Sequence, residues 1–273
     1  MRAAVLGAVV AVSVLVATLT FGSSLDTLAS RPSLYGWNWT VAMAAAGGVG
    51  VLPERQMKQQ LNGDHNVAAW SGYDFAQLQI DGKTEAVLGV RAGAPVMPPQ
   101  LSGHSLQGPG QVVLGTETLS QLHKRVGETV IVSSNGKSRK LRIVGTAALP
   151  AIGGRPHTDP GSGAVVDFRV IPKAARNIFN LPGGGPNAVF VRLKNPTNAA
   201  ALGQLQKISL VLQKAAQDQV VVIPVQRPAE VADAGTLRAN PRTWPSPSPR
   251  VRCWHWVSRS SRPFDDGDVT WRS

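Results

Sequence analysis

The longest run of hydrophobic positions in this sequence lies at its beginning. Residues 3–21 comprise nineteen residues without a charge, and no later stretch is as long and as apolar. As a helix with a rise of about 1.5 Å per residue, this run would be roughly 28 Å long, close to the hydrocarbon thickness of a bilayer. The pattern predicts a transmembrane helix in residues 1–23, with the chain that follows it outside the cytoplasm.

A cleaved signal peptide is the alternative interpretation of this run. Arg2 supplies a short positive start and residues 22–24 are small, so cleavage there would release a secreted binding module. However, the apolar core of a signal peptide usually has about 7–15 residues, and no clear A-x-A cleavage site follows this longer run. The length therefore favours a retained span. The charges at Arg2, Asp26 and Arg31 give only a slight preference for a cytoplasmic N-terminus.

After the span, the hydrophobic pattern alternates between the strand period and the helix period. Residues 75–80 alternate, Asp81-Gly82 is a typical hairpin turn, and residues 85–90 return as its partner. A second hairpin is predicted around Asn135-Gly136. Further strands are predicted at 67–70, 111–114, 164–168, 187–193 and 219–225, and helices at 54–61, 116–124, 172–179 and 198–217. This order predicts an α+β fold for residues 24–239.

The segment between the span and the first of these elements contains closely spaced aromatic residues. Residues 24–34 continue as a helix in this prediction, with Pro32 as its stop. The run Tyr35-Gly-Trp-Asn-Trp39 fits two descriptions equally: an aromatic belt at the membrane interface, or the start of a strand that continues to Met43. Residues 92–110 and 151–163 are rich in Gly and Pro and are predicted to be loops.

The composition narrows the class of protein. The hydrophobic content of 43% is enough for a folded core, and 28 Gly with 20 Pro indicate many loops. The formal charge of +12 raises the possibility of nucleic-acid binding, but Lys and Arg are dispersed and form no long block. We therefore expect no nucleic-acid partner and a basic surface near anionic lipid headgroups. The single cysteine, Cys253, excludes an internal disulfide framework and a cysteine-based zinc site.

The composition changes abruptly near Asn240. Residues 241–273 contain four of the seven tryptophans, the only cysteine, five prolines and six arginines. Neither the helix nor the strand period continues there, and disordered segments are usually poor in tryptophan. Residues 240–273 are thus predicted to be a disordered tail, and our hypothesis is that they are out-of-frame translation of a GC-rich gene.

No motif for catalysis, cofactor binding or metal binding is found. Gly136-Lys137-Ser138 imitates the end of a phosphate-binding loop, but that motif requires glycine at the position of Ile131 and a following helix. The histidines are isolated, and no G-x-S-x-G elbow is present. We predict that the chain is not an enzyme and has no catalytic residue, no cofactor and no metal ligand.

Several segments resemble FtsX-like ABC transporter permeases of actinobacteria. The most specific is Leu34-Tyr-Gly-Trp-Asn-Trp39, which follows the apolar run and Ser24-Leu-Asp26. Weaker matches occur at residues 113–116, 126–130, 141–145, 227–230 and 237–238, so the resemblance covers residues 2 to about 239. It implies a MacB-like extracytoplasmic domain, with a mixed α/β portion and a small β portion, placed between one transmembrane helix and a bundle of three.

The same resemblance implies a permease that works with a separate ABC ATPase on lipid, lipoprotein or peptide substrates. The sequence departs from the family pattern where the three further helices would follow, since the composition changes there instead. The expectation is therefore a truncated or frameshifted permease in the cell membrane, single-pass, with most of the chain extracytoplasmic and no transport on its own. Its expected partners are membrane lipid and, for a full-length permease, the ATPase; the substrate is not predicted.

Overall fold

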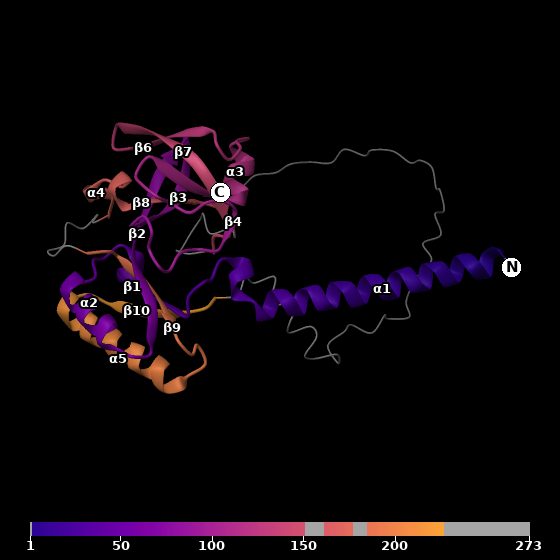
Figure 1. Cartoon of the computed structure of the whole chain (residues 1–273), viewed down its shortest axis with the longest axis horizontal. Helices are drawn as coiled ribbons and strands as arrows, with labels where there is room; N and C mark the ends of the chain where they lie inside the picture. Colours follow the sequence, from indigo (N-terminus) through magenta and orange to yellow (C-terminus); the bar gives the residue numbers. More distant parts are fainter. Residues whose placement is uncertain (1, 151–160, 177–184, 227–273) are drawn as a thin grey trace, which may run out of the picture.

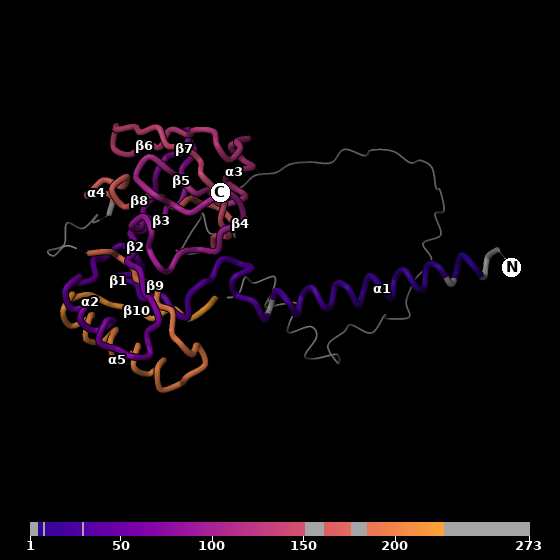
Figure 2. The backbone as a smooth tube through the Cα atoms, in the orientation of Figure 1, coloured from indigo at the N-terminus to yellow at the C-terminus, as the bar shows by residue number. Residues whose placement is uncertain are grey.

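The computed structural model describes residues 2–150, 161–176 and 185–226. It shows a long helix, α1, that projects from a body with two lobes (Figure 1). The backbone trace in Figure 2 shows that strand β2 runs through both lobes. We call the lobe with α2 and α5 the α/β lobe, and the lobe with β5, β6 and β7 the β lobe.

Helix α1 (Arg2–Ser30) contains the predicted span. The segment Val5–Leu28 has a mean hydropathy of 2.3 and is not buried by the body, so it is long and apolar enough to cross a membrane. The hydroxyl of Thr18 donates a hydrogen bond to the Val14 carbonyl at 2.8 Å, which removes the cost of a polar side chain in lipid. The helix ends just before Pro32, as predicted, and a short 3-10 helix, η1 (Pro32–Tyr35), follows.

The α/β lobe is an antiparallel sheet with two helices on one face. Its strands, in the order β10-β1-β9-β2, are β10 (Val220–Pro224), β1 (Val41–Ala45), β9 (Ala188–Leu193) and the first half of β2 (Val67–Ile80). Helices α2 (Glu54–Gly63) and α5 (Ala199–Ala216) cover the face formed by Met43, Val189 and Val191. The side chain of Asn198 accepts hydrogen bonds from two N–H groups of the first turn of α5, which fixes the start of that helix.

The β lobe is a ring of strands that closes on itself. From β2 the ring passes through β3 (Lys83–Val90), β8 (Ala164–Asp167), β5 (Gln111–Gly115), β7 (Lys137–Ala147) and β6 (Thr129–Ser134). It closes because β6 also pairs with β2, where Ile80 is opposite Val132. Leu78, Leu114 and Ile143 are among the side chains that fill the interior. Strand β4 (Gln100–Gly103) pairs with β7 in antiparallel orientation. The remaining short helices are η2 (Ala46–Gly48), α3 (Thr116–Gln121), η3 (Phe168–Val170) and α4 (Lys173–Arg176).

Both predicted hairpins are confirmed. Asp81 and Gly82 have φ values of 47° and 85°, and Asn135 and Gly136 have 49° and 73°. Positive φ at both central residues is the geometry of the tight turn that Asp-Gly and Asn-Gly favour. Gly136 thus lies in a hairpin turn, as predicted, and Lys137 and Ser138 begin β7 rather than a helix.

Other expectations about the elements were wrong. Residues 67–70 and 75–80 belong to one continuous strand, β2, because its two halves pair with different neighbours, β9 and β3. The predicted loop at 92–110 contains β4, which is held by pairing with β7. Within the predicted helix at 172–179, α4 covers Lys173–Arg176, and most of the remainder lies outside the described residues, as do most of loop 151–163 and the tail.

The aromatic run after α1 forms no belt at the membrane interface, and it precedes the predicted strand, which begins at Val41. Tyr35, Trp37 and Trp39 are buried, with at most 6% of each exposed, and all three lie before the start of β1. Trp39 stacks on Phe190 with ring centres 4.0 Å apart, and Tyr73 stacks on the same ring at 4.1 Å. Their burial is a long-range effect, because the aromatic core forms only when β1, β2 and β9 are assembled. This core joins the end of α1 to both lobes.

Candidate functional site

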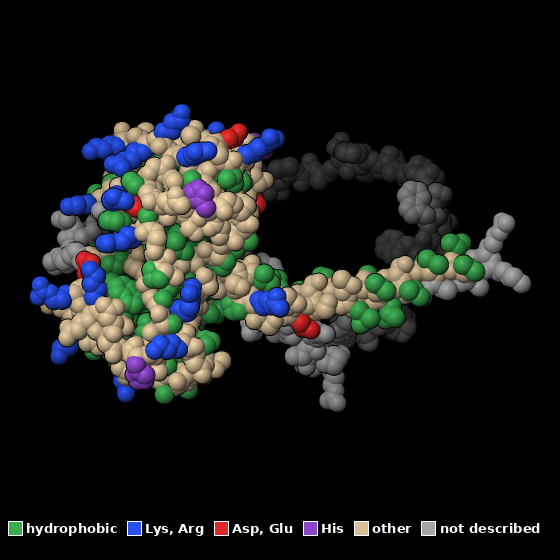
Figure 3. Space-filling view, in the orientation of Figure 1, with side chains coloured by type: hydrophobic (Ala, Val, Ile, Leu, Met, Phe, Trp, Pro, Cys, Tyr) green, Lys and Arg blue, Asp and Glu red, His purple; other side chains and the backbone are tan. Residues whose placement is uncertain are grey.

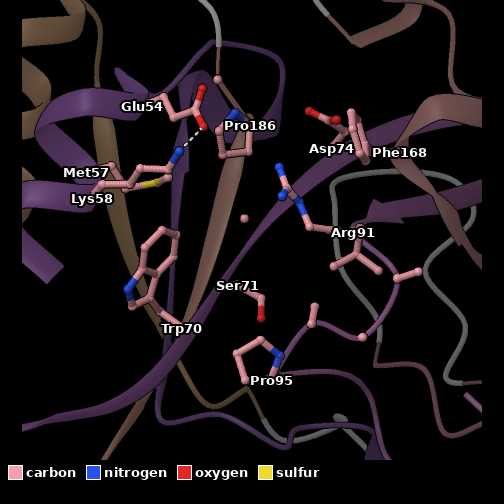
Figure 4. Close-up of a pocket in the computed structure, with 16 residues that line it drawn as sticks. Glu54, Met57, Lys58, Trp70, Ser71, Asp74, Arg91, Pro95, Phe168 and Pro186 are labelled. Carbon is pink, nitrogen blue, oxygen red and sulfur yellow. Dashed lines mark hydrogen bonds and ion pairs between the residues drawn. The ribbon is translucent and has the colours of Figure 1, made fainter. Parts of the chain in front are cut away.

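A cavity of about 490 Å³ lies where the two lobes meet. One wall comes from the start of α2, the floor from the middle of β2, and the opposite wall from the loop that follows β3 (Figure 4). Phe168 and Pro186 complete the lining. Pockets of roughly 300–1,000 Å³ at the junction of two structural units are typical ligand sites, so this cavity is the candidate functional site.

The α2 side of the cavity contains two apolar side chains, Met57 and Trp70, beside the charged pair Glu54 and Lys58. The indole Nε1–H of Trp70 donates a hydrogen bond to Oδ1 of Asn62 at 2.8 Å, at the end of α2. Met57 lies in the same wall and is only 2% exposed, since it also belongs to the core of the α/β lobe. A ligand would therefore meet a preformed aromatic surface here, backed by the buried Met57.

The loop of residues 91–95 forms the opposite wall and is held at both ends. At its C-terminal end, the Val96 N–H donates to the Ser71 hydroxyl at 3.0 Å, and the Tyr73 hydroxyl donates to the Val96 carbonyl at 2.6 Å. At its N-terminal end, the preceding residue, Val90, pairs with both Tyr73 and Asp167 in the sheet. Burial raises the pKa of Tyr73 far above its usual value, so the phenol stays protonated as a donor.

Asp167 is the anchor of this wall. Its side chain is fully buried and accepts hydrogen bonds from Nε and Nη2 of Arg169 at 2.7 and 3.0 Å. Burial by itself raises the pKa of Asp167, but the hydrogen bonds and positive charge of Arg169 outweigh it, and the pKa is lowered below its usual value. The carboxylate is thus charged and engaged, and we assign it a structural role.

The charged side chains around the cavity differ in whether another side chain pairs with them. Lys58 and Glu54 form an ion pair at 2.5 Å across one turn of α2, and Asp74 is 5% exposed and has interactions of its own. Arg91 is exposed and, within the described residues, its side chain makes no ion pair or hydrogen bond. The cavity therefore combines an apolar surface with one cation, an arrangement suited to binding a ligand that has an apolar part and a negative charge.

The structure does not bring the sequence's candidate chemistry together. His65, His104 and His123 lie in three separate loops, and the described part of the chain contains no group of three His, Cys, Asp or Glu side chains that could hold a metal ion. His157 and His255 lie outside the described residues, and so does Cys253. The expected absence of catalytic, cofactor and metal sites stays a prediction.

Comparison with known protein families gives one match that covers most of the chain. The model of the MacB-like periplasmic core domain matches residues 3–208. The chain belongs to this family. The resemblance to MacB-like permease domains is thereby confirmed, as is the predicted mixed α/β fold after an N-terminal apolar helix.

Several solved structures are similar to this MacB-like domain. The periplasmic region of MacB from Actinobacillus actinomycetemcomitans is 12% identical, with a TM-score of 0.45, over 76% of this chain and 95% of that one. The extracellular domain of the ABC-type transporter YknZ from Gram-positive bacteria is 10% identical, with a TM-score of 0.45, over 69% and 100%. A domain of a putative permease from Porphyromonas gingivalis is 15% identical, with a TM-score of 0.42, over 71% and 94%. A search of curated protein sequences found no match.

The sequence pattern did not reveal the cavity of this MacB-like domain. Trp70 was predicted only as a strand residue, and Arg91 as a residue next to a loop. The signal that was present is the pair of polar residues, Ser71 and Asp74, between two strand patterns. Both are buried in β2 at the point where the strand passes from one lobe to the other.

Proposed function

We propose that this chain is the membrane-anchored, non-catalytic extracytoplasmic part of an ABC transporter permease that works with a separate ATPase subunit. The observation that carries the proposal is the way α1 enters the body. Leu28, near the end of the apolar segment, packs against the aromatic core, and Tyr35, Trp37 and Trp39 are buried within it. A displacement of α1 would therefore move both lobes.

A close backbone contact supports the same conclusion. Gly36 has φ +96°, and a Cβ atom at this position would lie 2.3 Å from the backbone nitrogen of Pro150. The chain between α1 and β1 is therefore packed directly against the end of the β lobe. A flexible tether would not require such a contact, whereas a coupling element would.

In this proposal α1 is a single span in the cell membrane and the two lobes lie outside the cytoplasm. Extraction of membranes with alkaline carbonate tests the anchor, and the chain should remain in the pellet. Release into the supernatant would contradict it. The ATPase partner is tested by affinity purification of the full chain in mild detergent, where an ABC ATPase subunit should co-purify. A preparation from intact membranes that contains no such subunit would contradict that part.

The distribution of charge is compatible with a membrane-proximal position. Figure 3 shows Lys and Arg side chains spread over the visible face of both lobes, and hydrophobic side chains along α1. A dispersed positive charge is attracted to an anionic membrane surface without forming a defined site. The proposal therefore includes membrane lipid, and no nucleic acid, among the partners.

A secreted binding module is the second candidate, and the cavity between the lobes favours it. This form would arise by cleavage near Ser23 or Ser24. Mass spectrometry of the mature N-terminus separates the two candidates, because a new terminus at these positions would support secretion. The hypothesis that residues 240–273 are an out-of-frame tail also stays a prediction, which reading the gene in its other frames would test.

A further inference from the structure

We propose that the cavity between the lobes binds a small anionic amphiphile, whose apolar body lies against Trp70 and whose headgroup is bound by Arg91. The inference goes beyond the proposed function, since binding requires neither transport nor an ATPase. Figure 4 shows Trp70 and Arg91 on opposite sides of the cavity, with Ser71 between them. The ligand would therefore bridge the α2 side and the loop of residues 91–95.

The apolar half of the site is defined by side chains that are already ordered. The Trp70 indole is half-buried and held by Asn62, and Met57, Pro95, Phe168 and Pro186 are also in the lining. Such surfaces contribute affinity roughly in proportion to the apolar area that they remove from water. A purely ionic ligand would leave this part of the cavity unused, so the ligand needs an apolar body.

The polar half of the site favours a negative charge. Glu54 is neutralised by Lys58, and Asp74 is buried with interactions of its own, so the charge without a counterion among the described lining residues is that of Arg91. Guanidinium groups bind carboxylate, sulfonate-like and phosphate oxygens with paired N–H donors.

The position of Arg91 is set by the anchored loop. The residue directly follows β3, in which Val90 pairs with Tyr73 on one side and with the buried Asp167 on the other. The Ala94 N–H donates to the Arg91 carbonyl at 3.1 Å, which closes the turn. A cation on a fixed loop loses little backbone entropy on binding. The cavity volume of about 490 Å³ suits one apolar body with one headgroup.

The experiment measures binding of radiolabelled octanoate by equilibrium dialysis at neutral pH. The full chain is reconstituted in phosphatidylcholine nanodiscs, and empty nanodiscs correct for partition into lipid. Wild type should bind octanoate saturably, and octyltrimethylammonium, which has the same chain and the opposite charge, should not bind saturably. Arg91→Met should weaken octanoate binding by about ten-fold or more, the loss expected for a charge-assisted hydrogen bond. Arg91→Lys should lose less, and Trp70→Ala should also weaken binding.

The control is Arg139→Met, which removes an exposed cation of β7 that does not line the cavity and should leave binding unchanged. Thermal melting of each variant shows that it is folded. Absence of saturable binding by wild type, equal binding by Arg91→Met, or equal binding of the cationic probe would each overturn the proposal.

A second series, with phosphatidylglycerol in the nanodiscs, identifies the source of the ligand. Competition with octanoate in wild type, absent in Arg91→Met, would show that a bilayer lipid supplies the anionic headgroup. Unchanged octanoate binding would show that the ligand arrives from the aqueous phase.

Discussion

Replacement of Phe190 tests how much the stacked aromatic core contributes to the stability of the two-lobed body. The ring of Phe190 is completely buried and is stacked between Trp39 at 4.0 Å and Tyr73 at 4.1 Å. Phe190→Leu keeps most of the apolar volume but removes both stacked pairs, each worth about 0.5–1.5 kcal/mol. We expect a loss of about 2 kcal/mol in the free energy of unfolding. Phe190→Ala adds a cavity and should cost about 4 kcal/mol.

The assay is thermal unfolding of the full chain in mild detergent, followed by circular dichroism. For a domain of this size, 1 kcal/mol corresponds to about 2–4 °C in the midpoint, so Phe190→Leu should lower it by about 4–8 °C. Phe75→Leu is the matched control, because Phe75 is only partly buried and its ring centre is 6.1 Å from that of Phe190. The reasoning is refuted if Phe190→Leu and Phe75→Leu shift the midpoint equally, since stacking would then contribute nothing specific.

Three further perturbations follow from the geometry. Gly36→Ala should destabilise the chain much more than Gly82→Ala, and equal losses would contradict this. Both glycines have positive φ, which costs alanine about 1 kcal/mol, but only at Gly36 does the added Cβ meet backbone atoms within 4 Å. Asp167→Asn should make the free energy of unfolding less dependent on pH below about pH 4, as measured by melts from neutral to acid pH. The lowered pKa of Asp167 stabilises wild type above its unfolded pKa of 3.8, and this contribution is lost as the pH falls through the lower folded pKa. Tyr73→Phe should lower the free energy of unfolding by about 1 kcal/mol at neutral pH, because the hydrogen bond to the Val96 carbonyl is lost. Above pH 10 wild type should lose more stability than this variant, because Tyr73 ionises in the unfolded state while burial keeps it protonated in the folded state; melts at both pH values measure this.

Local features of the sequence were sufficient for most individual elements. Asp81-Gly82 and Asn135-Gly136 determine their hairpins because few residue pairs adopt two positive φ values in succession. Asn198 marks the start of α5 through its own hydrogen bonds to the next turn. The apolar run predicted α1 because its length and lack of charge are local properties.

What the sequence did not reveal depends on contacts between distant segments. β6 closes the β lobe by pairing with the end of β2, roughly fifty positions earlier in the chain, and no periodicity within either strand specifies this pairing. The aromatic residues near Trp39 were assigned to an interface or a strand because their partner, Phe190, is far away in sequence. Hydrophobic patterns show that a residue is suited to burial, but not which surface buries it.

The cavity and the aromatic core share one strand, and this connection links the two proposals. Tyr73 stacks on Phe190 through its ring, while its hydroxyl holds the loop that carries Arg91. Ser71, two positions earlier, holds the same loop from the floor of the cavity. A movement of α1 that displaces the aromatic core would reach Tyr73 through Trp39 and Phe190, and would thus act on the wall of the cavity. Conversely, a ligand that fixes this wall would restrict the core to which α1 is joined. Such coupling is reciprocal, because any effect of α1 on ligand affinity implies an equal effect of the ligand on the position of α1.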